Sequence, residues 1–166
     1  MSNYWISIDP SKASTGIAVW SGRDLEEHFV IKPRGNKGKY YFGDEVVDSR
    51  RTAYKERLVE LVEPKAVYIE RGMGHFAAAV RAQGMMCGYI DSKFEDKWFI
   101  NPVEVVVSEW RRVIKEDQGI SWPADSKRCK QLSIDLTKEL YGIDVCDDEA
   151  DAILLGRACQ RMFNIK

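Results

Sequence analysis

Four carboxylates in this sequence stand where elements of secondary structure are expected to end or begin. Asp9 closes a strand-like stretch, Glu70 closes a second one, and Asp148 and Asp151 fall in the first turn of an expected helix. The last two are three residues apart, so they share a helix face and repel one another when both are ionised. Four carboxylates without a histidine or cysteine ligand favour a hard cation such as Mg²⁺ or Mn²⁺. Two such ions, about 3.5–4 Å apart, can activate a water and stabilise the leaving oxygen of a phosphodiester.

Each of these acids also has a structural explanation that needs no metal. Asp9 precedes Pro10, and an Asp-Pro pair commonly opens a turn. Acids in the first turn of a helix interact favourably with the helix dipole, by about 0.3–1 kcal/mol each. The two explanations differ in a way that a structure can test: a metal site requires Asp9 to lie close to Asp148, and the structural roles do not.

The chain begins with the pattern of three antiparallel strands. Ile6 and Ile8 alternate with Ser7, which is the period of a strand, and serine, threonine and glycine then supply a tight turn. The strand pattern resumes over Ile17–Trp20, and a hairpin turn leads to a third strand over Leu25–Lys32.

Helices and strands alternate in the rest of the chain, which predicts a mixed α/β sheet. The expected elements are a helix over 44–63, a strand over 66–70, a helix over 75–90, a strand over 98–100, a helix beginning at Ser108, a helix from Ser126 to Gly142 and a final helix from Asp147. The helix over 75–90 is dense in alanine and glycine, which fits either close internal packing or a subunit interface.

Size and composition indicate an ordinary globular protein. The 166 residues are expected to form one domain, 1–166, with 45% apolar and 31% charged residues. The four cysteines form no CxxC pair, so neither a zinc site nor a disulfide framework is indicated. No apolar run is long enough to span a membrane and the first residues do not form a signal peptide, so we expect a protein of the cytoplasm with no membrane partner.

Basic residues gather in two parts of the chain, although the net charge is −1. A loop with glycines and a proline carries four cations and no acid, namely Lys32, Arg34, Lys37 and Lys39. Three aromatic residues follow it, so the loop suits phosphate contact and base stacking, and a solvated loop whose aromatics join the core explains it as well. The helix from Ser126 has Lys127, Arg128 and Lys130 in its first turn, where they oppose the helix dipole, which favours a bound external anion.

Four motifs together resemble one nuclease family. ISIDPSKASTGIAVW resembles the first hairpin of the RuvC-type Holliday junction resolvases of the ribonuclease H-like superfamily. YIERG resembles the second acidic strand of that family, RAQG the helix after it, and DDEADAILLG the final acidic helix. The motifs span nearly the whole chain in the family's order. The resemblance implies a ribonuclease H-like fold: a five-stranded mixed sheet, three antiparallel strands followed by parallel ones, flanked by helices.

The resemblance also implies roles for individual residues. Asp9, Glu70, Asp148 and Asp151 would be catalytic and would bind two Mg²⁺ ions, for which Mn²⁺ can substitute. Lys127 would be the catalytic lysine, with Lys130 as the alternative, and Arg111 or Arg112 a second basic residue. The residues expected to contact DNA are Lys32, Arg34, Lys37, Lys39, Arg111, Arg112 and Lys130.

The activity implied by the resemblance is the cleavage of four-way DNA junctions by a homodimer that cuts two symmetric strands, in a bacterial cell or a phage-infected host. Each cut would leave a 5′-phosphate and a 3′-hydroxyl. The segment with WRR and a Trp-Pro loop is closer to phage and divergent members, and the residues that insert at a junction centre are not recognisable. A nuclease acting on flaps, forks or RNA–DNA hybrids is therefore the main alternative. A sugar-kinase-like phosphotransferase and a DNA-binding module without catalysis are two others.

Overall fold

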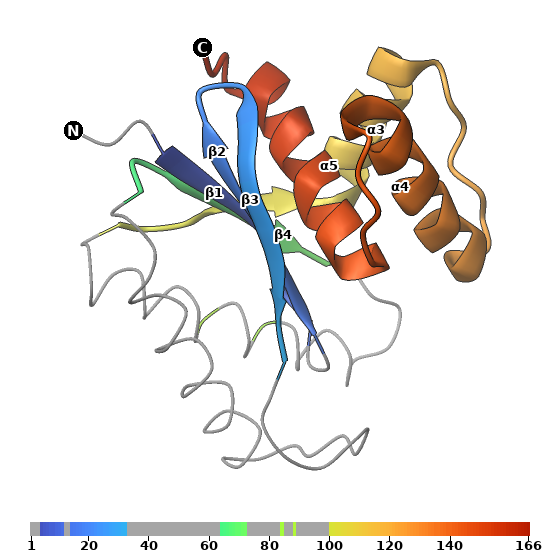
Figure 1. Ribbon diagram of the computed structural model, residues 1–166, viewed down its shortest axis with the longest axis horizontal. Helices are drawn as coiled ribbons and strands as arrows, with labels where there is room; N and C mark the ends of the chain where they lie inside the picture. The colour runs from blue at the N-terminus through green and yellow to red at the C-terminus, as the bar shows by residue number, and fades with distance from the viewer. Residues whose placement is uncertain (1–3, 12–13, 33–63, 73–83, 85–87, 89–99) are drawn as a thin grey trace.

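Five strands form one mixed sheet in the computed structural model, which describes residues 4–11, 14–32, 64–72, 84, 88 and 100–166. The strands are β1 (Tyr4–Asp9), β2 (Thr15–Ser21), β3 (Asp24–Ile31), β4 (Val67–Arg71) and β5 (Val103–Val106), in the spatial order β3-β2-β1-β4-β5. The first three pair antiparallel, and β4 and β5 continue the sheet in parallel with β1 (Figure 1). This arrangement confirms the predicted fold class.

Three helices follow the sheet: α3 (Val107–Gln118), α4 (Ser126–Tyr141) and α5 (Asp147–Met162). α5 lies against one face of the sheet, and α3 and α4 pack on α5 (Figure 1). α3 and α4 end at Gly119 and Gly142, which adopt φ angles of 65° and 70° that favour glycine. The end of α4 at Gly142 was predicted from the sequence. None of the helices in the described part of the chain is long and apolar enough to cross a bilayer.

Two predicted boundaries were wrong. Ser108 does not cap a helix, because β5 runs straight into α3 and the extended residue before the helix is Val106. Ile100 is not in a strand; the strand after it is β5, whose pairing with β4 begins only at Val103. The predicted helices over 44–63 and 75–90 lie outside the described residues, except that Gly84 and Gly88 are helical.

A buried hydrogen-bond chain holds α5 to the centre of the sheet. Alternation along β1 directs Ser7 towards α5, where its hydroxyl donates to the Ala152 carbonyl at 2.7 Å. The Trp20 indole N–H on β2 donates in turn to the Ser7 hydroxyl at 2.9 Å. Trp5 stacks on Trp20 at 5.2 Å between ring centroids. These three side chains are almost fully buried, so each buried polar group here is satisfied by a partner.

Two glycines allow α5 to approach the sheet closely. A Cβ at Gly16 would lie 1.9 Å from the carbonyl oxygen of Asp148, so the first turn of α5 rests directly on β2. A Cβ at Gly156 would lie 2.4 Å from the Trp20 indole nitrogen. Glycine at these two positions sets the distance between α5 and the strands, and thereby the position of the acids in the first turn of α5 relative to the sheet.

An ion-pair cluster joins the C-terminal part of α3 to α5. The Asp117 carboxylate, with 5% of its side chain exposed, accepts hydrogen bonds from Arg157 at 3.0 Å and also pairs with Arg161. Burial alone would raise the pKa of Asp117, but its bonds to Gln118 and the two arginines outweigh burial and lower it. The cluster fixes the position of α3 relative to α5.

We expect the Gly16→Ala substitution to lower the free energy of unfolding by about 3 kcal/mol or more, because its methyl group would overlap backbone atoms that cannot rotate away. Urea denaturation measures the loss. Gly84→Ala is the matched control. A Cβ added at this helical glycine meets nothing within 4 Å, so the free energy of unfolding should stay unchanged or rise by up to about 1 kcal/mol. Equal stability of native protein and Gly16→Ala would contradict the close approach of α5.

Candidate active site

Asp9 and Glu70 stand side by side at one edge of the sheet. β1 and β4 run parallel and pair Ile8 with Ile69, so the next residue of each strand is an acid. The carboxyl ends of parallel strands meet at the same edge, and α5 begins there because Gly16, the antiparallel partner of Asp9, supports the backbone of Asp148. The structure thus brings β1, β4 and the first turn of α5 to one place.

Glu70 is buried and hydrogen-bonded. It is 8% exposed, and one of its oxygens, Oε2, accepts a hydrogen bond from the Trp110 indole nitrogen at 2.7 Å. Burial and the charge of Asp151 raise the pKa of Glu70 to about 7, against the opposing effects of the Trp110 hydrogen bond and the Arg111 guanidinium. Glu70 is therefore an acid whose charged form is costly in this environment.

Asp151 is held in a similar way on α5. Its Oδ1 accepts a hydrogen bond from the Ser133 hydroxyl of α4 at 2.5 Å. Burial raises its pKa, and the charge of Asp147 adds to this rise, whereas Ser133, Arg111 and Lys130 oppose it. Each of these two acids thus has a hydrogen-bond donor from a different helix.

Asp9 experiences the charges of the other three predicted ligands. Its pKa is raised well above the usual value, first by burial and then by the negative charges of Glu70, Asp151 and Asp148, while Lys130 lowers it. Mutual repulsion of this kind requires the four carboxylates to lie near one another. The pairing of Asp9 with Gly16, which lies against the Asp148 backbone, also places Asp9 near the first turn of α5.

The donor chemistry of the four acids fits a hard divalent cation. They offer only carboxylate oxygens, and the raised pKa values of Asp9, Glu70 and Asp151 reflect, besides burial, negative charge that a bound cation would neutralise. Their oxygens are nevertheless spread out: among the described residues, the group whose ligand atoms lie within 4.8 Å of one another is Cys146, Asp147 and Asp148. That group shares one member with the predicted set.

The predicted basic residues divide into those beside the acids and those farther away. Lys130 pairs with Asp147, and this hydrogen bond, together with the charges of Asp147, Asp148 and Asp151, raises its pKa despite partial burial. Lys127, in the first turn of the same helix, is exposed. The sequence left these two lysines as alternatives, and the charge interactions with the acids involve Lys130.

Arg111 lies in an aromatic clamp that the sequence did not predict. Its guanidinium carbon lies 5.3 Å from the ring centroid of Trp110 and 5.0 Å from that of Trp122, within the range of cation–π attraction. The clamp is closed by the Trp122 indole N–H, which donates to the Arg111 carbonyl at 2.8 Å. Arg112 and Lys32 are exposed, and Arg34, Lys37 and Lys39 lie outside the described residues.

Two partners of the predicted acids, Trp110 and Ser133, were missed from the sequence, as was the contact between His28 and the neighbouring Glu149. His28 contacts a carboxylate oxygen of Glu149 through Nδ1 at 2.8 Å. Ser133 follows Lys130 by three residues and so shares its helix face, which was the only sign in the sequence that Ser133 lies near the acids.

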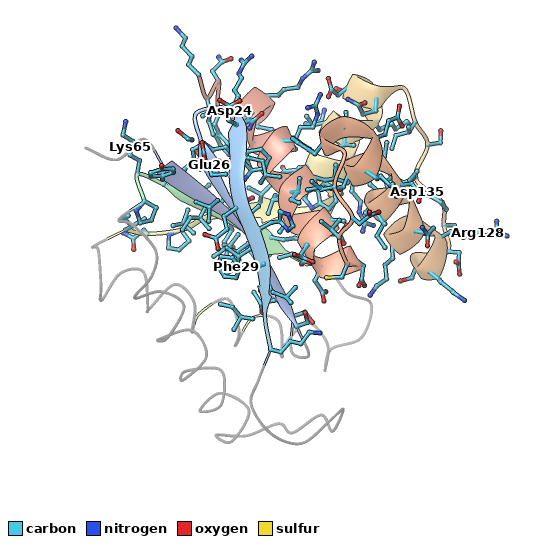
Figure 2. All side chains as sticks on the ribbon, in the orientation of Figure 1. Asp24, Glu26, Phe29, Lys65, Arg128 and Asp135 are labelled. Atoms are coloured by element: carbon cyan, nitrogen blue, oxygen red, sulfur yellow. The ribbon has the colours of Figure 1, made fainter. Side chains whose placement is uncertain are left out.

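Figure 2 shows the opposite side of α4, where Arg128 and Asp135 point away from the sheet.

No family model matches this chain, and no curated protein does either. Solved structures do. Thermus thermophilus RuvC in complex with a Holliday junction substrate superposes with a TM-score of 0.68, at 15% identity over 98% of both chains. A second structure of Thermus thermophilus RuvC gives 0.60, at 15% identity and the same coverage. Ydc2, the yeast mitochondrial Holliday junction resolvase, gives 0.51 at 16% identity, covering 96% of this chain and 80% of Ydc2.

The chain has the fold of the RuvC resolvases. This confirms the resemblance drawn from the four motifs at the level of architecture. The similarity extends over 98% of the chain, so it includes β1, β4 and α5, the three elements that carry the predicted acids.

We expect Glu70→Gln to stabilise the protein in EDTA at about pH 8 by roughly 1–3 kcal/mol, because native Glu70 must ionise in a buried, negatively charged place. A raised pKa contributes stability below the unfolded value, about 4.5, which is lost as pH rises through about 7. Urea unfolding across this range should show a steeper decline for native protein than for the variant. Parallel curves would contradict the burial of a charged Glu70.

Proposed function

We propose that the protein is a Mg²⁺-dependent endonuclease that resolves four-way DNA junctions by hydrolysing phosphodiesters in two symmetric strands. The observation that supports the proposal is that the end of β1, the end of β4 and the start of α5, which carry four carboxylates, lie at one edge of the sheet. The elements that carry these acids belong to a fold shared with Thermus thermophilus RuvC, whose structure was solved with a Holliday junction substrate. The fold alone would not support a nuclease, because one fold hosts many activities.

Asp9, Glu70, Asp148 and Asp151 would hold the cations. Bound there, the cations would activate a water and stabilise the leaving oxygen of the phosphodiester. Burial of Glu70 and the repulsion among the acids make the cation-free site unfavourable, which favours cation binding when all four are ionised.

Lys130 is the lysine that we assign to the reaction, in preference to Lys127. Its ammonium group pairs with Asp147 in the first turn of α5, and its charge acts on Asp9, Asp148 and Asp151, so it would stand beside the acids that hold the cations. Its raised pKa keeps it protonated at neutral pH, and a protonated amine can donate to a phosphate oxygen.

DNA contact would extend outwards from this edge of the sheet. Arg111, Arg112 and Lys32 belong to the predicted contacts, together with Arg34, Lys37 and Lys39. Contacts to phosphates position a nucleic acid without reading its sequence, which suits recognition by shape. Two copies related by a twofold axis would match the symmetry of a four-way junction, so we propose a homodimer.

Cleavage of synthetic DNA tests the proposal. In Mg²⁺, native protein should cut a mobile four-way junction at paired symmetric positions, and EDTA should abolish the cuts. Asp9→Asn should lose more than about 100-fold in rate, because it removes a cation ligand and even outer partners of ligands are worth about 10–100-fold. Asp148→Asn and Asp151→Asn should bind the junction without cutting it. A flap and an RNA–DNA hybrid are assayed in parallel: cutting of these alone, or undiminished cutting by Asp9→Asn, would refute junction resolution.

The two lysines can be separated by a matched pair of variants. Lys130→Ala should lower the single-turnover cleavage rate by about 10-fold or more, because it removes a charge-assisted contact, worth about 1.5–3 kcal/mol, beside the acids. Lys127→Ala removes the same charge from the same turn of α4 and should affect mainly junction affinity. A rate loss confined to Lys127→Ala would reverse the assignment.

A further inference from the structure

We propose that Trp110 and Ser133 are positioning residues, which orient Glu70 and Asp151 for the cation by hydrogen bonds from neutral, buried donors. The inference rests on the proposed function only in taking these two carboxylates as cation ligands. It concerns groups that would touch neither the cation nor the DNA.

Trp110 donates in a direction that its surroundings determine. Its side chain is fully buried, and an indole has a single donor, Nε1, which reaches Glu70 Oε2 at 2.7 Å. The ring meets Trp122 edge to face at 5.7 Å, and the Trp122 indole is itself bonded to the α3 backbone. A ring held on these sides cannot rotate its N–H away, so it holds Oε2 of the Glu70 carboxylate in place.

Ser133 acts on Asp151 from α4. It is fully buried, and its hydroxyl donates to Asp151 Oδ1 at 2.5 Å. One turn later on α4, the equally buried Thr137 hydroxyl has no hydrogen-bond partner within the described residues. A buried hydroxyl on α4 is therefore not automatically paired with an acid, and the bond from Ser133 is specific to its position.

The charge of the donor separates these acids from others in the described part of the chain. Asp117 is bonded to two arginines, and Asp147 to Lys130. The donors to Glu70 and Asp151 described above are an indole and a hydroxyl, and the Arg111 guanidinium also acts on both acids through its charge. A cationic donor would cancel the charge that a metal ion needs, whereas a neutral donor holds the carboxylate in place and leaves that charge available.

The test compares Mn²⁺ affinity, measured by titration calorimetry in the absence of DNA. Trp110→Phe keeps a buried aromatic ring without the N–H, and Ser133→Ala removes only the hydroxyl. Each should weaken Mn²⁺ binding by about 10-fold or more, the usual consequence of losing an outer partner of a ligand. Cleavage by both variants should recover as Mn²⁺ is raised, because the ligands themselves remain.

Two control variants remove the same groups elsewhere. Trp5→Phe deletes a buried indole N–H that donates to the Gly22 carbonyl at 2.8 Å, and Thr137→Val deletes the unpaired hydroxyl on α4. Urea unfolding in EDTA establishes that all four variants are folded, and both controls should bind Mn²⁺ as the native protein does.

Folded Trp110→Phe and Ser133→Ala proteins that bind Mn²⁺ as tightly as the native protein would overturn the inference. An equal loss of affinity in the controls would overturn it too, since the effect would then be general to buried substitutions. If native protein binds Mn²⁺ but cuts no junction, only the proposed function is refuted. The positioning roles of Trp110 and Ser133 are still tested, because they are measured by Mn²⁺ affinity and not by cleavage. Native protein that binds no Mn²⁺ would overturn both.

Discussion

The contact between the Asp148 backbone and Gly16 is the constraint on which the rest of the structure depends. It sets the first turn of α5 on the strand beside β1, and the Ser7 bond to Ala152 and the Trp20 contact at Gly156 continue the same close approach along the helix. α3 and α4 pack on α5, so their side chains take their positions from this one contact. The acidic site is consequently a product of helix-on-sheet packing at backbone distance.

The ionised acids of the site repel one another and lower the stability of the folded protein when no cation is bound. Burial and the neighbouring acids raise the pKa values of Asp9, Glu70 and Asp151, and each unit of such a shift corresponds to about 1.4 kcal/mol. A folded protein has a net free energy of unfolding of about 5–15 kcal/mol, so the cost of ionising these acids is large in comparison. Extensive packing elsewhere, with three tryptophans of the core almost fully buried, compensates for this cost. Functional sites commonly conflict with stability in this way.

Local patterns in the sequence predicted the features that depend on neighbours along the chain. Strand alternation located β1 to β3, and Gly142 located the end of α4, because these signals are set within a few residues. The four acids were identified because they stand at such boundaries. The bonds to Glu70 and Asp151 were not predictable, since Trp110 and Ser133 reach them across 40 and 18 residues of sequence through tertiary packing alone. Of the two missed boundaries, Ser108 lies where β5 joins α3 without a loop, and Ile100 lies just before β5 begins.

That loop-free joint has a consequence for how such a chain can vary. α3 begins at Val107, directly after the last residue of β5, so the rotation of the helix about its axis is inherited from the strand. One inserted residue would turn every later side chain of α3 by about 100° and carry the Trp110 indole away from Glu70. The bond from the Trp110 indole to Glu70 therefore depends on the number of residues between Trp110 and Val105, which pairs with Glu70 in the sheet. The direct connection between β5 and α3 therefore determines where the side chains of α3 lie relative to the acids at the edge of the sheet.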